Sequence, residues 1–75
     1  MHNGSPVFRL NNRLKVARAE KNLSQEQLAA AAGVTRQTIS SIETGQYNPS
    51  ALLVLRLARC LEKRVEDLFS LEEQP

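Results

Sequence analysis

The sequence predicts an all-α protein, a compact five-helix domain. The 75 residues suffice for one domain, which at this size buries only about 60% of the surface of its unfolded chain. Helix caps and glycines divide the chain into short segments whose apolar residues recur at helical spacing. Aromatic residues make up only 4% of the chain, so the core should be aliphatic.

The two ends of the chain are predicted to lie outside the folded part. Residues 1–8 begin with MHNGSP and should form a flexible leader, although residues 7–10 could be either an extended arm or packing that precedes the first helix. Residues 72–75 form an acidic tail that should fray. The domain is therefore expected to span residues 9–71.

The first helix is expected at residues 12–21. An asparagine at position 11 or 12 can cap its start, and Asn22 can end it in the left-handed conformation. Leu10, Leu14 and Ala17 share one face, which should pack on the two helices that follow.

A capping box marks the start of the second helix. Ser24 is followed three residues later by Gln27, so the hydroxyl can accept an amide hydrogen bond while the Gln side chain reaches back. Four alanines at 29–32 favour a helix that others can approach closely. Gly33 should end it, because glycine enters the left-handed conformation without steric cost.

The third helix, residues 36–44, begins after Thr35, a good N-cap. The short linker between the two helices is typical of a helix-turn-helix. Thr38, Ile39 and Ile42 point one way. The opposite stripe lacks the Glu and Lys pairs of an ordinary exposed surface and consists of Arg36, Gln37, Ser40, Ser41 and Thr44. Such groups hydrogen-bond to base edges and phosphates.

Gly45 should end this helix, and an Asn-Pro turn then leads to Ser50, the cap of a helix over residues 51–61. This helix, ALLVLRLARCL, is the most apolar segment but is too short to span a bilayer, so it belongs to the core. Its core-facing stripe consists of Val54, Leu57, Ala58 and Leu61. A last short helix is expected at residues 65–71, with acidic residues in its first turn and Leu68 and Phe69 turned inward.

The run LSQEQLA…AGVTRQTISSIETG…YNPS resembles the DNA-binding domain of lambda-repressor-like Cro/cI (XRE-type) transcriptional regulators. The resemblance covers roughly residues 12–69, and the matching positions are Gln25, Ala29, Gly33, Val34, Ile39, Ile42, Glu43 and Gly45. It implies a sequence-specific DNA-binding regulator, more often a repressor, whose helix 36–44 reads the major groove. An antitoxin of a toxin–antitoxin pair, and a protein-interaction adaptor on the same fold, are the alternatives.

Candidate DNA contacts fall into two groups. Side chains that can read base edges are Arg36, Gln37, Ser40 and Ser41. Side chains that can hold the sugar-phosphate backbone are Gln25, Arg13, Lys15, Thr35, Thr44 and Asn48. The basic residues concentrate in the same part of the chain, since residues 1–45 carry six basic and three acidic groups while residues 46–75 carry four and five. This distribution suits a polyanionic partner at one face.

The resemblance also implies an ion pair between Arg18 and Glu43, which would fix the orientation of the third helix. On sequence alone, Arg18 could instead extend past the apolar stripe to solvent.

The sequence lacks the residues of an enzyme or a metal site. His2 and Cys60 are the single histidine and cysteine, so neither a zinc ligand set nor a catalytic triad is predicted, and we expect no cofactor. A lone cysteine makes no internal disulfide, which fits the reducing cytoplasm. We expect the protein to be cytoplasmic and associated with the nucleoid. No membrane association and no ligand-sensing domain are expected.

A homodimer on an inverted-repeat operator in double-stranded DNA is expected, because one small domain covers only one half-site. The dimer surface is placed where apolar residues are in surplus, at Leu52, Leu53, Phe69 and Leu71. These residues could instead simply complete a small core.

Overall fold

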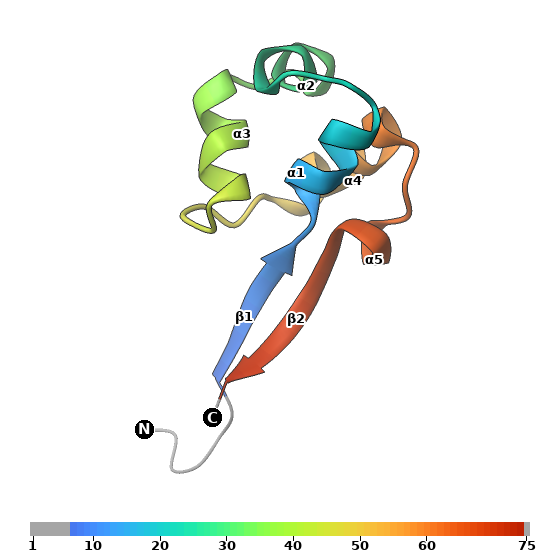
Figure 1. Cartoon of the computed structure of the whole chain (residues 1–75). Coiled ribbons are helices and arrows are strands. Elements are labelled where there is room, and N and C mark those ends of the chain that lie inside the picture. Colours follow the sequence, from blue (N-terminus) through green and yellow to red (C-terminus); the bar gives the residue numbers. More distant parts are fainter. Residues whose placement is uncertain (1–6, 75) are drawn as a thin grey trace.

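The structure is a computed structural model that describes residues 7–74. Five helices gather at one end of the molecule, and two strands extend away from them (Figure 1). The elements, in chain order, are β1 (Val7–Asn12), α1 (Leu14–Glu20), α2 (Gln25–Ala32), α3 (Arg36–Glu43), α4 (Ala51–Leu61), α5 (Val65–Leu68) and β2 (Phe69–Gln74). The five-helix prediction is confirmed for this part of the chain.

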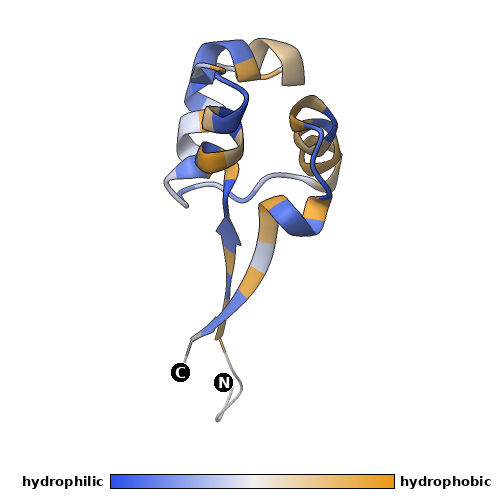
Figure 2. Cartoon of the chain, turned by 45° about the vertical axis from the view of Figure 1, so that its right-hand side comes forward, coloured by the Kyte–Doolittle hydropathy of each residue, from blue (hydrophilic) through white to orange (hydrophobic). Residues whose placement is uncertain are grey.

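The all-α prediction is wrong, because β1 and β2 pair as an antiparallel two-stranded sheet, here called the ribbon. The ribbon forms because apolar residues alternate along both strands and face each other across them, as in the pair Leu10 and Leu71. Figure 2 shows the alternation of hydrophobic and hydrophilic residues along β2. The last helix consequently ends at Leu68 instead of continuing to residue 71.

The predicted domain limits change with the ribbon. Val7 and Phe8, assigned to the leader, lie in β1, and residues 72–74 of the predicted fraying tail lie in β2. The rest of the predicted leader, residues 1–6, and the last residue, Pro75, lie outside the described residues.

Helix α1 begins at Leu14, two residues later than predicted, because Asn12 belongs to β1. The Asn12 side chain still contacts the helix start, since its Oδ1 accepts a 3.1 Å hydrogen bond from the Leu14 amide. Its Nδ2 donates to the carbonyl of Ile42 at 2.9 Å and so ties β1 to α3. Asn22 is left-handed after α1, with φ 56°, as predicted.

The local signals for α2, α3 and α4 are confirmed. The Ser24 hydroxyl accepts from the Gln27 amide at 3.0 Å and the Gln27 side chain accepts from the Ser24 amide at 2.8 Å, which completes the capping box. Gly33 takes φ 77°. Thr35 and Ser50 each accept an amide hydrogen bond at the start of the next helix.

Every helix contributes to one apolar core. Its fully buried side chains are Leu14, Leu28, Ile39, Ile42, Leu57, Leu61 and Leu68. Leu53 and Phe69 also lie in this core, at 7% and 8% exposure. The predicted dimer surface is therefore wrong for these two residues, whereas Leu52 and Leu71 are exposed. Within residues 7–74, no helix has the length and apolarity needed to cross a membrane.

Candidate nucleic-acid interface

The apolar side of α3 packs in the core, and its polar side faces away from the core. Ile39 and Ile42 are buried in the core, and α3 packs against α2 across a three-residue turn. The α3 polar face consists of Arg36, Gln37, Ser40, Ser41 and Thr44. Arg36, Gln37 and Thr44 are exposed, while Ser40 and Ser41, in the middle of the face, are partly buried.

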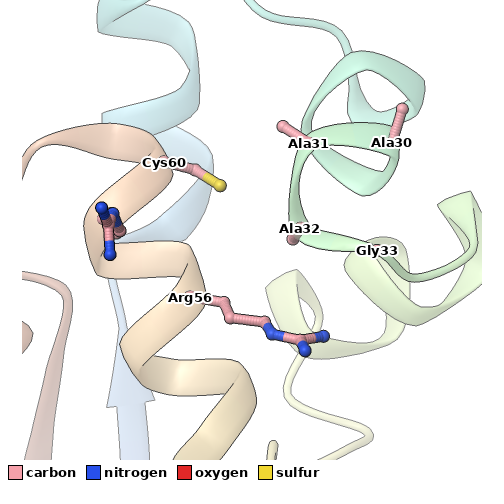
Figure 3. A pocket seen from close by; sticks show the side chains of 7 residues that line it. Ala30, Ala31, Ala32, Gly33, Arg56 and Cys60 are labelled. Atoms are coloured by element: carbon pink, nitrogen blue, oxygen red, sulfur yellow. The ribbon is translucent and has the colours of Figure 1, made fainter.

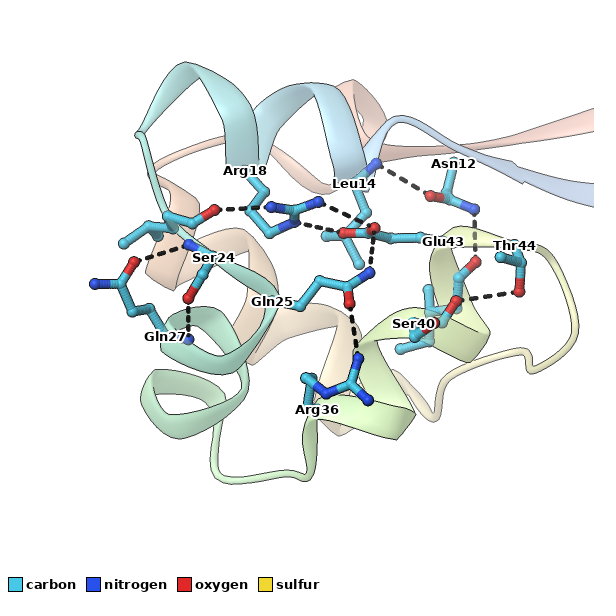
Figure 4. Close-up of polar contacts among 12 residues, drawn as sticks. Asn12, Leu14, Arg18, Ser24, Gln25, Gln27, Arg36, Ser40, Glu43 and Thr44 are labelled. Carbon is cyan, nitrogen blue, oxygen red and sulfur yellow. Dashed lines mark hydrogen bonds and ion pairs between the residues drawn. The ribbon is translucent and has the colours of Figure 1, made fainter.

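A chain of polar contacts connects this face to the interior (Figure 4). The Arg18 Nε donates to Glu43 Oε2 at 2.7 Å, and Arg18 Nη1 donates to the carbonyl of Leu23 at 2.8 Å. Gln25 continues the chain, because its Nε2 donates to Glu43 Oε1 at 3.0 Å and its Oε1 accepts from Arg36 Nη1 at 3.3 Å. Arg36, at the start of α3, is thus linked through α2 to α1.

The Arg18–Glu43 ion pair is mostly shielded from solvent, with side-chain exposures of 15% and 4%. The hydrogen bond to Glu43 raises the pKa of the Arg18 guanidinium, against the opposing effect of burial. The pair joins α1 to the last residue of α3 by a charge-assisted hydrogen bond.

Three of the predicted backbone-binding side chains already make hydrogen bonds within the protein. Gln25 uses both ends of its amide in the network above. Thr35 accepts from the Thr38 amide and shares a 3.0 Å hydrogen bond with the Thr38 hydroxyl. The Thr44 hydroxyl donates to the carbonyl of Ser40 at 3.1 Å, so its proton points back into α3. Binding of a phosphate oxygen by Thr44 requires the hydroxyl to rotate.

The two basic residues predicted to touch the backbone lie on different flanks of α1. Arg13 lines a groove of about 390 Å³ between α1 and α5, together with Glu20, Glu66 and Asp67. At 100° per residue, exposed Lys15 shares the flank of Arg18, which faces α3. Lys15 thus lies on the flank of α1 that faces α3. Arg13 lies on the other flank, in a groove that also contains Lys63 and whose three carboxylates pair with Lys63 or Arg64.

The loop after α3 brings in a residue that the predicted site omitted. The amides of Gln46 and Tyr47 donate to the carbonyl of Ser41 at 2.9 and 3.2 Å, which folds the loop back along α3. Half-exposed Tyr47 thereby lines a groove of about 230 Å³ with Gln37, Thr38 and Ser41. No local sequence signal places the ring there, because the position depends on how the loop returns. Asn48, the next residue, is exposed, as a backbone contact requires.

A third groove lies between α2 and α4 and contains no residue of the α3 polar face (Figure 3). Its volume is about 520 Å³, and its lining residues are Ala30, Ala31, Ala32, Gly33, Arg56, Arg59 and Cys60. Helices α2 and α4 are neighbours in the fold, and the α2 side of the groove carries only small side chains.

The helix-turn-helix family model matches residues 14–68, which contain all five helices of the described part. The chain belongs to this family of DNA-binding transcriptional regulators. The match confirms the expected family.

Individual proteins agree with the family match. The chain is 45% identical over 65 residues to the uncharacterized HTH-type transcriptional regulator YgzD of Bacillus subtilis, covering 87% of this chain and 98% of that protein. It is 45% identical over 64 residues to an uncharacterized HTH-type transcriptional regulator of Methanocaldococcus jannaschii, covering 85% and 97%. Among solved structures, the restriction-modification controller protein C.AhdI from Aeromonas hydrophila superposes with a TM-score of 0.70 at 38% identity, covering 73% of this chain and 83% of that chain.

Proposed function

We propose that this regulator recognises a specific DNA sequence by inserting α3 into the major groove. Arg36 suits the O6 and N7 atoms of guanine, and Gln37 suits the N6 and N7 atoms of adenine. Ser40 and Ser41, one turn further along the same face, can each donate to or accept from a base edge. Tyr47 borders this surface and adds an apolar ring that can contact a thymine methyl group.

The observation that carries the proposal is the contact chain behind Arg36. Its guanidinium bonds to Gln25, which itself bonds to the carboxylate of Glu43. A long arginine side chain loses rotamer freedom when it binds, and a partner that already restrains it reduces this cost. An arginine that served only solubility would gain nothing from such restraint. The arrangement therefore supports a specific contact by Arg36.

Backbone contacts would fix the position of the reading helix. Lys15 supplies a charge on the α1 flank that faces α3, and Asn48 supplies an exposed amide after it. Thr35 and Thr44 lie at the ends of α3 and can contact phosphates if their internal hydrogen bonds rearrange. Gln25 can donate the second hydrogen of its Nε2 to a phosphate oxygen and keep its bonds to Glu43 and Arg36. Arg13 is left out because it lies on the other flank of α1.

The proposed functional unit is a homodimer on an inverted-repeat operator, where it acts as a repressor in the cytoplasm, in association with the nucleoid. A few base contacts from one α3 cannot distinguish one site from roughly 10⁶–10⁹ competing sites, and two-fold pairing doubles the readout. Repression requires only that the bound dimer cover a promoter, so the DNA-binding surface suffices for it.

Sequence selection from random DNA tests the proposal. The wild type should select an inverted repeat, and Gln37→Ala should lose the preference at one position in each half-site, a change of about 1–3 kcal/mol in discrimination. Gln27→Ala, which removes an exposed amide from α2, is the matched control and should select the wild-type sequence. Selection of no sequence by the wild type, or of the same sequence by both Arg36→Ala and Gln37→Ala, would contradict the proposal.

A further inference from the structure

The two faces of the ribbon have different chemistry. Residues directly opposite each other in an antiparallel pair lie on the same face, so the register assigns every position. One face, the apolar ribbon face, carries Phe8, Leu10, Phe69 and Leu71, with Asn12 and Glu73 at its ends. The other face is mainly polar and carries Val7, Arg9, Asn11, Ser70 and Glu72.

The apolar ribbon face continues the core outward but is not covered at its outer end. Phe69 is buried and Leu10 partly buried, whereas Phe8 and Leu71 are 54% and 69% exposed. The hydrogen bond from Asn12 to the Ile42 carbonyl turns this face toward the end of α3. A groove of about 500 Å³ lies there, lined by residues 7–10 of β1 and by Thr44, Gly45 and Asn48.

The inner end of the ribbon packs on the core through Phe69, whereas its outer end is exposed among residues 7–74. An isolated two-stranded sheet is marginally stable in water unless further strands or a helix cover its apolar face. Both views show the outer ribbon extending away from the helices, in a molecule that measures 43 × 21 × 19 Å (Figures 1 and 2). Both strands fall outside the family match to residues 14–68.

We propose that a second copy of this chain covers the apolar ribbon face with its own. A symmetric pair needs a surface complementary to itself, and this face meets the requirement because its centre is uncharged and apolar. Glu73, its one charged residue, lies at the outer end. Residues 1–6, which precede β1, offer Met1 as their one large apolar side chain, too little to cover the same area.

The exposed area indicates how strong this pairing is. Phe8, Leu10 and Leu71 together offer apolar area on the order of 250 Å² per copy, compared with about 800 Å² per partner in a stable interface. Two ribbons therefore pair weakly in free solution and pair efficiently when two half-sites hold two copies close together. The inference rests on the proposed two-fold DNA binding, and it places the contact at the end of α3 next to the proposed phosphate-binding loop.

Chemical crosslinking tests which surface meets its copy. In a Cys60→Ser background, a thiol-reactive crosslinker of about 10 Å, the spacing of two packed sheets, is added to single-cysteine variants bound to operator DNA. Leu71→Cys should form covalent dimers at least tenfold faster than Glu72→Cys, its neighbour on the opposite face. Equal rates for the two, or efficient crosslinking only for Leu52→Cys on α4, would overturn the inference.

Cooperative DNA binding separates this inference from the proposed function. Phe8→Ser should lower cooperativity on a two-half-site duplex at least tenfold and leave single half-site affinity unchanged. Val7→Ser is the matched control, because Val7 is equally exposed at 53% but lies on the opposite face. If the wild type selects no DNA sequence, the proposed function fails; if it binds cooperatively and Phe8→Ser does too, only the ribbon inference fails. Circular dichroism at the helical bands confirms that both variants remain folded.

Discussion

The α3 polar face and the apolar ribbon face are both exposed, but the protein supports them in different ways. Behind the α3 polar face, Arg36 donates a hydrogen bond to Gln25, and Gln25 in turn donates to the shielded carboxylate of Glu43. On the ribbon, Phe8 and Leu71 extend beyond the core and are more than half exposed among the residues that the structure describes. The first surface is ready to bind polar groups as it stands, whereas the second is completed only by another apolar surface. The predictions below test this contrast, from the largest expected effect to the smallest.

Removal of Arg18 should have the largest effect on stability. Arg18→Ala leaves the Glu43 carboxylate shielded without its ionic partner, so the free energy of unfolding should fall by roughly 2–4 kcal/mol, below the full range for deeply buried pairs because Arg18 is partly exposed. Urea denaturation measures the change. Arg59→Ala, an exposed arginine on α4, is the control and should stay within about 0.5 kcal/mol. If both variants lost equally little, the α3 support would not depend on this pair.

Loss of the capping box should cost less. Ser24→Ala removes the acceptor of the Gln27 amide and should lower the free energy of unfolding by about 1 kcal/mol. Ser70→Ala, on the polar face of the ribbon, removes a hydroxyl of the same size and should change it by less than about 0.5 kcal/mol. Thermal unfolding of the two variants side by side gives the comparison. A larger loss for Ser70→Ala would mean that the ribbon, and not the helix start, limits stability.

The α1 flank facing α3 should contribute one backbone contact. Lys15→Ala should weaken binding to all DNA sequences alike and make the plot of log affinity against log salt shallower by about one unit. Arg13→Ala removes a charge of the same sign from the α5 side and should leave the slope unchanged. The reverse result would mean that DNA approaches α1 from its other flank.

The smallest effect is expected at the exposed pair that starts α5. Arg64 Nε donates to Asp67 Oδ2 at 3.2 Å, and this hydrogen bond lowers the pKa of Asp67. A lowered folded-state pKa stabilises the protein above the unfolded value of about 3.9, and the contribution disappears as pH falls through the folded value. The difference in free energy of unfolding between wild type and Arg64→Ala should therefore be constant from about pH 5 to 7 and shrink at lower pH. A difference that grows on acidification would show another origin.

The positions of α2, α3 and α4 followed from the sequence because their signals are local. Ser24, Thr35 and Ser50 each bond an amide a few residues away, and Gly33 ends α2 by its own backbone conformation. Such contacts form within one turn of chain, so a short window of sequence contains the information.

The ribbon did not follow from the sequence, because its pairing joins the two ends of the domain. Each strand has only six residues, and the alternation of Phe8 with Leu10 becomes meaningful only opposite Phe69 and Leu71. The site shows the same limit. The Arg18–Glu43 pair was expected from a family resemblance, but the bridge by Gln25 and the return of Tyr47 to α3 depend on tertiary packing.

The reading of base edges by Arg36 is tested most directly by replacing guanine with 7-deazaguanine at each guanine of the selected half-site. This base keeps its pairing and O6 but lacks the N7 acceptor, so at one position it should weaken wild-type binding by about tenfold, the value of one lost charge-assisted hydrogen bond. Arg36→Ala should bind the modified and unmodified duplexes equally. Loss of affinity at no position, or an equal loss for wild type and Arg36→Ala, would contradict a major-groove contact by this residue.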